Sequence, residues 1–140
     1  MKYVLASASP RRRELLKQII DDFEICPAEA EEKVNLSLFP DQIACALAES
    51  KCDEAFRKYP EATVIGCDTI VVFQNEILGK PKDREDAFNT LKKLSGRTHY
   101  VITGVCVRNK FKKLVEFDTT EVKFNTLTDE FIEKYIATGS

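Results

Sequence analysis

The sequence has no tryptophan, a single histidine and five cysteines, with no C-x-x-C pair among them. An odd number of cysteines without paired spacing argues against a disulfide framework, and the shortage of histidine argues against a structural zinc site. We expect the thiols to be buried and reduced. A metal ion would then have to be held by carboxylates, which favours Mg²⁺ or Mn²⁺.

The sequence also lacks any apolar run near the roughly 18 residues of a membrane span, and its N-terminus lacks the apolar region of a signal peptide. It contains no internal repeat, low-complexity tract or linker, and its formal net charge is only -2. A charge so close to zero argues against general affinity for nucleic acid. These absences predict one domain over residues 1–140, located in the cytoplasm and bound to neither membrane nor nucleic acid.

What the sequence does contain is a concentration of positive charge at the start of a predicted helix. Ser9 is a suitable N-cap and Pro10 suits the first helical position. Arg11, Arg12 and Arg13 then fill the first turn, where the helix dipole and unpaired N–H groups already favour anions. This arrangement predicts that a phosphate group binds there. The alternative is an exposed arginine run balanced by nearby carboxylates.

The same helix carries an apolar stripe that we expect to be buried, formed by Leu15, Leu16, Ile19 and Ile20. Arg12 precedes this stripe by one helical turn, so its side chain should point along the core side into a cleft. Arg13 should lie nearer the edge. The hydroxyl of Ser7, together with Ser9 and the free N–H groups, completes the predicted phosphate site.

A second helix is predicted from about Pro40 to Lys58, and Lys51 is the one charged residue in its apolar stripe. A lysine in this position either extends its amine out of the edge of the core or places it in an anion site. Earlier in the chain, Glu32 belongs to an acidic loop. Such loops are usually only solvated, and a metal or substrate role for Glu32 needs further support.

The segment 62–73 reads as a strand, an interruption at residues 66–68, and a second strand. Gly66 predicts a bulge or a close approach of another backbone. Asp68 stands inside an apolar run, so its carboxylate must face a cavity, a partner or a metal. Asp68 is therefore the best single candidate for catalysis, and the alternative is a structural, hydrogen-bonded aspartate.

Further along, a rigid Gly-Lys-Pro turn presents Lys80, and Asp83 is a natural N-cap for a helix that reaches about Leu94. The remaining predicted elements are a hairpin of strands 99–107 and 114–125, which turns at Asn109 and Lys110, and a helix 129–137 capped by Thr128.

Taken together, six blocks of the sequence resemble the Maf family of nucleoside triphosphate pyrophosphatases, which is related to the inosine triphosphatase-like enzymes. The blocks occur in family order: LASASPRRRELL at 5–16, AEEK at 30–33, LAESK at 47–51, GCDTIV at 66–71, LGKPKD at 78–83 and LSGRTHYVITGV at 94–105. The resemblance implies an α/β fold of the Maf/inosine triphosphatase-like type, with a mixed twisted β-sheet flanked by helices and a cleft between two lobes.

The resemblance also implies a role for each matching residue. Asp68 would be the proton acceptor, and Glu32 together with Asp68 would hold a divalent cation, Mg²⁺ or Mn²⁺. The substrate-binding residues would be Ser7, Arg11, Arg12, Lys51, Thr69 and Lys80. The reaction of the family is hydrolysis between the α and β phosphates, which yields a nucleoside monophosphate and pyrophosphate.

Arg11 and Thr69 resemble the branch of the family that acts on dTTP and UTP, so we expect these substrates, with modified pyrimidine nucleotides as further candidates. The alternatives are a pyrophosphatase for 7-methyl-GTP or another nucleotide, and a non-catalytic nucleotide-binding module. Family members typically continue well beyond the position of Ser140, so we expect a chain that lacks the C-terminal part of the family fold. A homodimer is common in the family, although the sequence itself does not reveal the oligomeric state.

Overall fold

The computed structural model describes residues 2–27, 38–79 and 81–138. The predicted roles of Glu32 and Lys80 lie outside the described residues. The chain forms two compact units, of which the first contains Met1–Thr69 and Thr103–Asp118 and the second contains Ile70–Ile102 and Thr119–Ser140.

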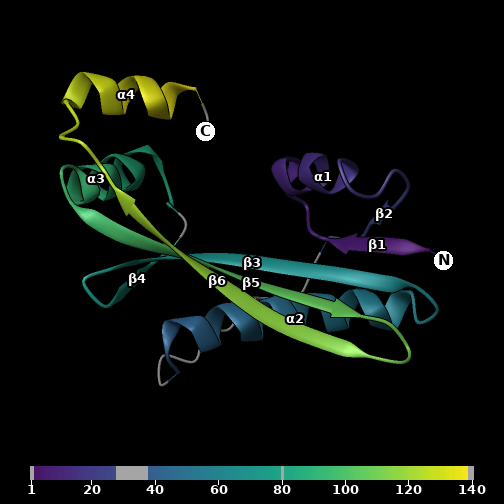
Figure 1. Cartoon of the computed structure of the whole chain (residues 1–140). Coiled ribbons are helices and arrows are strands. Elements are labelled where there is room, and N and C mark those ends of the chain that lie inside the picture. The colour runs from purple at the N-terminus through teal and green to yellow at the C-terminus, as the bar shows by residue number, and fades with distance from the viewer. Residues whose placement is uncertain (1, 28–37, 80, 139–140) are drawn as a thin grey trace. The chain divides into compact units, whose positions relative to one another are not determined.

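The strands form a mixed sheet, shown in Figure 1. Its strand order is β2 (Glu24–Ile25), β1 (Tyr3–Ala6), β3 (Thr63–Phe73), β5 (Thr98–Arg108) and β6 (Lys113–Lys123). The first unit contains β1, β2 and parts of β3, β5 and β6. Strand β1 runs parallel to both of its neighbours, and its last residue, Ala6, lies opposite Gly66 of β3. The predicted α/β fold with a mixed sheet is confirmed.

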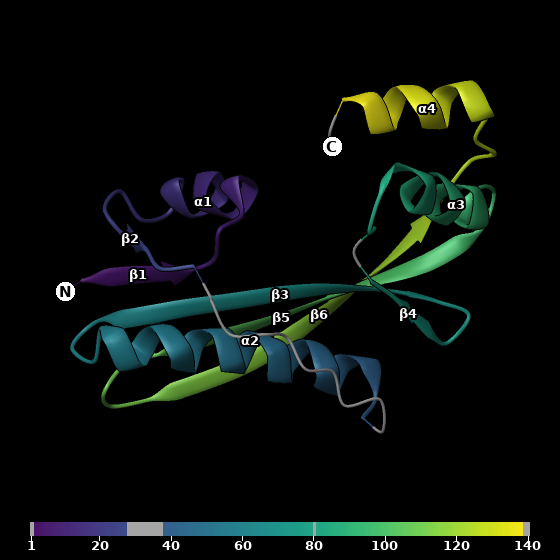
Figure 2. The same ribbon diagram turned by 180° about the vertical axis from the view of Figure 1, so that it is seen from behind.

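Helix α2 (Pro40–Lys58) lies along one face of this sheet, as Figures 1 and 2 show from opposite sides. The predicted apolar stripe is buried, since Ile43, Leu47 and Ala55 are at most 7% exposed. The helix comes very close to two strands. A Cβ atom added at Gly66 would lie 2.7 Å from the Ala48 carbonyl oxygen, and one added at Gly104 would lie 2.4 Å from that of Ala44. The close approach predicted at Gly66 is therefore confirmed.

The interruption predicted at residues 66–68 is wrong, because β3 is one continuous strand of 11 residues. Gly66 has no side chain, which lets α2 pack closely against the strand at this position, so no bulge is required. Asp68 is accommodated because its carboxylate forms an ion pair with Lys51. An extended strand therefore continues through two residue types that are usually depleted in strands.

Helix α1 (Pro10–Lys17) begins where predicted, but its buried stripe is not the predicted one. Leu15 is 55% exposed and Ile19 is 82% exposed. The half-buried residues are Arg12, Leu16 and Ile20, which follow one another at intervals of four. The helix also ends at Lys17, so Ile19 and Ile20, the last two residues of the expected stripe, lie beyond its end. The inward face is thus turned away from Leu15, and Arg12 keeps its predicted inward position.

The second unit contains a hairpin strand, β4 (Glu76–Leu78), which pairs with β3, and two helices, α3 (Arg84–Leu94) and α4 (Asp129–Ala137). Asp83 and Thr128 cap these helices as predicted, each accepting a hydrogen bond from a first-turn amide. The two helices contact each other, and Lys92 forms an ion pair with Asp129. None of the described helices combines the length and apolarity that crossing a membrane requires.

Candidate functional site

The predicted site residues of the first unit gather where β1 ends. Because β1 stops at Ala6, opposite Gly66, while β3 continues, the turn that follows β1 lies beside the residues of β3 that come after Gly66. The carboxyl end of a parallel strand that leads into a helix N-terminus is a common position for anion-binding sites. Here that helix is α1, with its three arginines.

Two serines shape this turn. The hydroxyl of Ser7, which is only 7% exposed, accepts a hydrogen bond from the amide of Ser9 at 3.1 Å. The hydroxyl of Ser9 in turn accepts one from the amide of Arg12 at 3.3 Å, which is the predicted N-cap contact. The turn is therefore held by its own side chains, and the start of α1 is fixed relative to β1.

The guanidinium group of Arg12 reaches across to β3. Its Nη1 donates to the carbonyl oxygen of Cys67 at 3.3 Å, and its Nη2 donates to Oγ1 of Thr69 at 2.9 Å. The inward direction predicted for Arg12 is thus confirmed. Arg11 and Arg13 are exposed. Among the three arginines it is Arg12, rather than Arg11, that the structure brings to Thr69.

A second threonine extends this contact, and sequence reasoning missed it. Oγ1 of Thr69 and Oγ1 of Thr103 on β5 lie 3.1 Å apart, within hydrogen-bonding distance. Thr103 belongs to a sequence block that resembles the family, yet a threonine in a strand is common and gives no signal by itself. Only the pairing of β3 with β5 shows that its hydroxyl belongs to the site.

Lys51 and Asp68 form a nearly buried ion pair. Nζ of Lys51 lies 2.6 Å from Oδ1 of Asp68, and the two side chains are 15% and 9% exposed. This resolves the choice left open for Lys51: its amine turns inward from α2 rather than out of the core edge. The pair also explains how an aspartate can be buried in this strand, because Lys51 supplies the partner that a buried carboxylate requires.

The two pairs approach β3 from opposite sides of the sheet. Successive side chains of a strand point to opposite faces, so Asp68 lies on the face covered by α2 and Thr69 lies on the other face. Lys51 therefore reaches the strand from one side and Arg12 from the other, at consecutive residues. The side chains of Arg12 and Lys51 thus both contact residues 67–69 of β3, next to the N-terminus of α1.

The thiol of Cys67, between these two pairs, is not arranged as a nucleophile. Burial raises the pKa of the Cys67 thiol, and the nearby Arg12 and Lys51 offset that rise only in part. A thiol with a raised pKa stays protonated near neutral pH and reacts slowly. All five cysteines are free thiols; Cys26, Cys52 and Cys106 are buried as predicted, whereas Cys45 and Cys67 are partly exposed.

The described residues offer a limited set of metal ligands. Within residues 2–27, 38–79 and 81–138 there is no group of three or more His, Cys, Asp or Glu side chains that could hold a metal ion. Asp68 is the carboxylate that the structure places in the site. A single carboxylate suits Mg²⁺, which is commonly bound through one or two carboxylates together with substrate phosphates. The donor set therefore fits a cation that arrives with a polyphosphate.

Two solved structures share the fold at low sequence identity. A Ham1 protein from Staphylococcus aureus has a TM-score of 0.62 and 18% identity, with 88% of this chain and 71% of that chain covered. A nucleoside-triphosphatase / dITP/XTP pyrophosphatase from Mycobacterium abscessus has a TM-score of 0.56 and 13% identity, with 99% and 95% covered. The expected inosine triphosphatase-like fold is thereby confirmed.

Sequence relatives are much closer. A dTTP/UTP pyrophosphatase of Ruminiclostridium cellulolyticum is 50% identical over 139 residues, and one of Thermococcus gammatolerans is 47% identical over 136 residues. In both cases the match covers 97% of this chain and 72% of the relative. The family model described as Maf-like protein matches residues 2–140. With that match over nearly its whole length, the chain belongs to the Maf-like protein family.

Proposed function

We propose that this protein is a nucleotide pyrophosphatase that hydrolyses dTTP and UTP to the nucleoside monophosphate and pyrophosphate. The observation that carries the proposal is that Asp68, paired with Lys51, and Thr69, paired with Arg12, are consecutive residues of β3 just beyond the end of β1. Relatives at 44–50% identity are named dTTP/UTP pyrophosphatase, which supports the same substrates. The geometry fits a reaction in which cations hold a polyanion next to one carboxylate.

The chain's own residues would divide the chemistry between them. The Asp68 carboxylate accepts a proton from a water molecule as that water attacks the α phosphorus. The bond between the α phosphorus and the oxygen that bridges to the β phosphorus breaks, and pyrophosphate leaves with the bonding electron pair. Lys51 fixes the direction of the carboxylate, while Arg12 and the N–H groups at the start of α1 bind phosphate oxygens and stabilise their growing charge.

A divalent cation, Mg²⁺ or Mn²⁺, is part of this proposal. Asp68 would hold it together with phosphate oxygens of the substrate, and Glu32 stays a predicted second ligand. The ion would supply a positive charge that neutralises the leaving pyrophosphate. Removal of divalent ions with EDTA should abolish turnover, and adding back Mg²⁺ or Mn²⁺ should restore it.

A pyrophosphate-release assay tests the proposal directly. The purified chain is incubated with Mg²⁺ and, in parallel, with dTTP, UTP, CTP and 7-methyl-GTP. We expect release from dTTP and UTP above that from the other two nucleotides. Release from 7-methyl-GTP alone would replace the substrate assignment. Binding of nucleotides without any release would overturn the enzyme and support a nucleotide-binding module instead.

The Asp68→Asn variant tests the proton acceptor. An amide has nearly the same shape but cannot take up the proton, so pyrophosphate release should fall by a factor of about 100 or more. Circular dichroism should show that the variant, although less stable, has the wild-type fold at the assay temperature, and binding of UTP should persist. Turnover that survives this substitution would place the proton acceptor elsewhere in the protein.

A further inference from the structure

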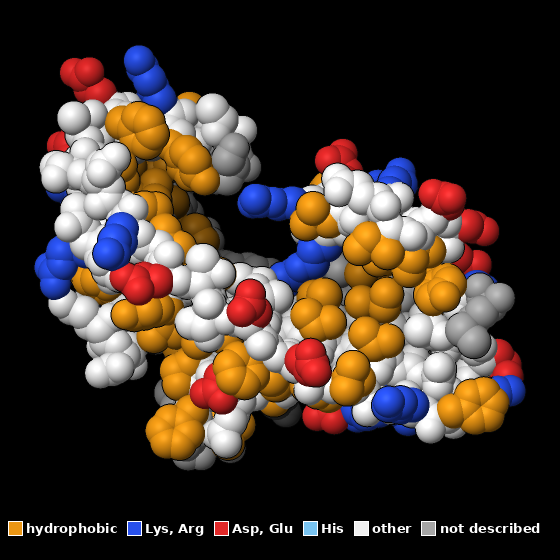
Figure 3. Space-filling view, in the orientation of Figure 1, with side chains coloured by type: hydrophobic (Ala, Val, Ile, Leu, Met, Phe, Trp, Pro, Cys, Tyr) orange, Lys and Arg blue, Asp and Glu red, His pale blue; other side chains and the backbone are white. Residues whose placement is uncertain are grey.

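An open groove lies on the first unit, on the same side of the sheet as Thr69. It has a volume of about 540 Å³ and is lined by residues of two neighbouring strands, Thr103, Val105 and Val107 on β5 and Leu114, Glu116, Phe117 and Asp118 on β6. Figure 3 shows hydrophobic and acidic side chains side by side on the surface over these strands. Its size is within the range of small-molecule sites.

The register of the β5–β6 hairpin fixes which lining residues face each other. At the turn, the amide of Asn109 donates to the carbonyl of Lys112, and near the other end the amide of Phe124 donates to the carbonyl of Arg97. Both bonds define the same antiparallel register, so no bulge interrupts the ladder between them. Thr103 therefore lies directly opposite Asp118.

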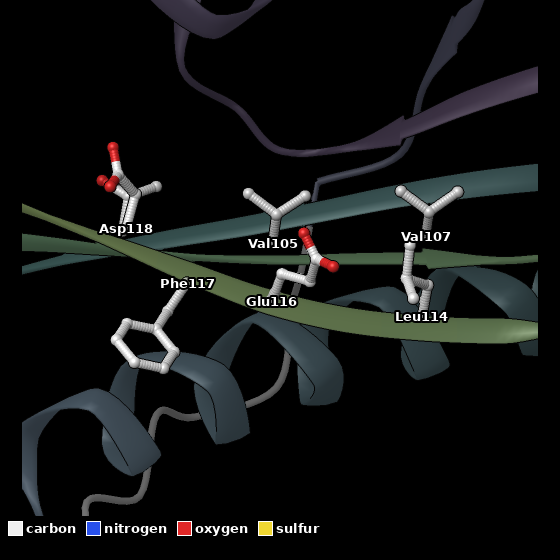
Figure 4. A pocket seen from close by; sticks show the side chains of 7 residues that line it. Val105, Val107, Leu114, Glu116, Phe117 and Asp118 are labelled. Carbon is white, nitrogen blue, oxygen red and sulfur yellow. The ribbon is translucent and has the colours of Figure 1, made fainter.

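The same register places Val105 opposite Glu116 and Val107 opposite Leu114. The groove thus has a polar end at Thr103 and an apolar end at Val107. Figure 4 shows Val105, Val107 and Glu116 standing on one side of the strands, while Phe117 points to the other side. Two valines and a leucine form an apolar surface along which a flat ring can lie.

The polar end of the groove is continuous with the proposed phosphate site. Arg12 donates to Thr69, Thr69 is hydrogen-bonded to Thr103, and Thr103 faces Asp118 across the hairpin. One row of side chains thus runs from α1 over three strands, from a guanidinium group through two hydroxyls to a carboxylate. A triphosphate held at the start of α1 leaves the rest of its nucleotide free to extend along this row.

The Thr103 hydroxyl and the Asp118 carboxylate, which face each other, match two adjacent groups on the edge of one kind of base. Uracil and thymine present an imide edge, in which the N3–H donor lies between two carbonyl acceptors. Guanidinium and hydroxyl groups donate to carbonyl oxygens, whereas an ionised carboxylate only accepts. Cytosine has an unprotonated N3, so its lone pair would face the oxygen of the carboxylate.

We propose that the β5–β6 groove is the nucleobase subsite and that Asp118 accepts the N3–H of a uracil or thymine ring. The ring lies on the apolar surface formed by Val105 and its neighbours, and Thr103 binds a ring carbonyl. This inference rests on the proposed function, since it assigns the base-binding part of the same site. It identifies Asp118 as a specificity residue against cytosine.

The experiment compares base selectivity in Asp118→Asn with that in wild type. Non-hydrolysable analogues of UTP and CTP, with an imido group between the α and β phosphorus atoms, are titrated by calorimetry into the full chain with Mg²⁺. Inorganic tripolyphosphate is titrated as the ligand without a base. Glu121→Gln, which neutralises a carboxylate of β6 outside the groove lining, is the matched control.

We expect the preference for the UTP analogue over the CTP analogue to fall by about tenfold or more in Asp118→Asn, because a charged hydrogen bond is lost and an amide can donate to N3 of cytosine. Tripolyphosphate should bind equally to all three proteins, and Glu121→Gln should keep the wild-type preference. An unchanged preference in Asp118→Asn, or an equal loss in the control, would overturn the base subsite.

The proposed function can fail separately from this inference. A wild-type chain that prefers the UTP analogue but releases no pyrophosphate from UTP would refute the enzyme and leave the base subsite in place. Conversely, turnover of UTP with an unaltered preference in Asp118→Asn would refute the subsite and leave the enzyme in place. A chain that binds neither tripolyphosphate nor the analogues would overturn both.

Discussion

At the scale of single residues, the site is organised by an ion pair that is costly to build and costly to break. Removing a carboxylate and an amine from water carries a large desolvation penalty, which their attraction offsets only when the geometry is good. Lys51 and Asp68 meet this condition with a 2.6 Å contact between side chains that are 15% and 9% exposed. An uncharged pair of similar volume would pack equally well, so the two charges indicate a role other than stabilising the fold.

Replacing only one partner should therefore destabilise the protein. In Lys51→Met the Asp68 carboxylate loses the cation that compensates its burial, and the free energy of unfolding should fall by about 3 kcal/mol. The double variant Lys51→Met with Asp68→Asn should recover part of this loss, because no charge stays buried. Urea denaturation of Lys51→Met, Asp68→Asn, the double variant and wild type measures both effects. Equal stability of the single and double variants would show that the two charges are not coupled.

Arg12 allows a second test at this scale, since Arg13 beside it provides a matched control of equal charge. Arg12→Gln removes the donor that reaches Thr69, and kcat/KM for UTP should fall by about 10- to 100-fold. Arg13→Gln removes the same charge from an exposed side chain and should leave kcat/KM within about twofold of wild type. Equal losses in the two variants would mean that only the total charge at the helix matters.

At the scale of the elements, α2 positions Lys51 because two glycines let it approach the sheet. Gly66 and Gly104 lie under successive turns of the helix, where the added Cβ atom of any other residue would meet its backbone. Lys51 follows Ala48, which lies over Gly66, by less than one turn. The 2.6 Å contact with Asp68 depends on this close packing.

Gly104→Ala should consequently disturb both stability and activity. Its Cβ would lie 2.4 Å from a carbonyl oxygen of α2, so the helix must shift, and overpacking of this kind costs about 1–3 kcal/mol. The shift should also separate Lys51 from Asp68 and reduce kcat. Gly79→Ala is the control, because an added Cβ meets nothing within 4 Å there. Thermal unfolding and the pyrophosphate assay, run on both variants, give the comparison.

The elements that could be predicted from the sequence are those with local signals. Caps such as Ser9, Asp83 and Thr128 mark helix starts through contacts within three residues, and each forms the predicted bond. The continuity of β3 could not be predicted, because the partner that stabilises Asp68 is 17 residues away in the chain. The inward face of α1 likewise could not be predicted, since an eight-residue helix gives too little periodicity to fix its rotation.

At the scale of the whole molecule, the candidate site likewise contains some residues that could be predicted from the sequence and others that could not. Arg12, Lys51 and Asp68 could be predicted, because each is a charged residue in an apolar stretch or at the start of a helix. Thr103 and Asp118 could not, because their significance depends on strand pairing between segments far apart in the sequence. β3, β5 and β6 contribute residues to both compact units, so the sheet links segments whose local sequence carries no sign of the link.

Stability of the whole chain should depend on pH through its one histidine. His99 is 5% exposed and packs edge-on against Phe124 with ring centroids 4.7 Å apart. In the described part of the chain, no group lies within hydrogen-bonding distance of its Nδ1. Burial lowers the pKa of the His99 imidazole below its usual value, because the charged form loses its hydration.

The sign of the effect follows from linkage. In the unfolded chain His99 takes up a proton at about pH 6.5, whereas in the folded chain it does so only at lower pH. The contribution of neutral, buried His99 to the free energy of unfolding is therefore fully present above pH 6.5 and is lost as the pH falls towards the folded pKa. His99→Phe keeps an aromatic ring against Phe124 and removes the titration. Wild type should lose stability relative to this variant by up to about 1.4 kcal/mol for each pH unit below 6.5. Urea unfolding of both proteins at pH 8, 7, 6 and 5 measures the difference. A difference that stays constant from pH 8 to pH 5 would mean that His99 titrates alike in the folded and unfolded chain.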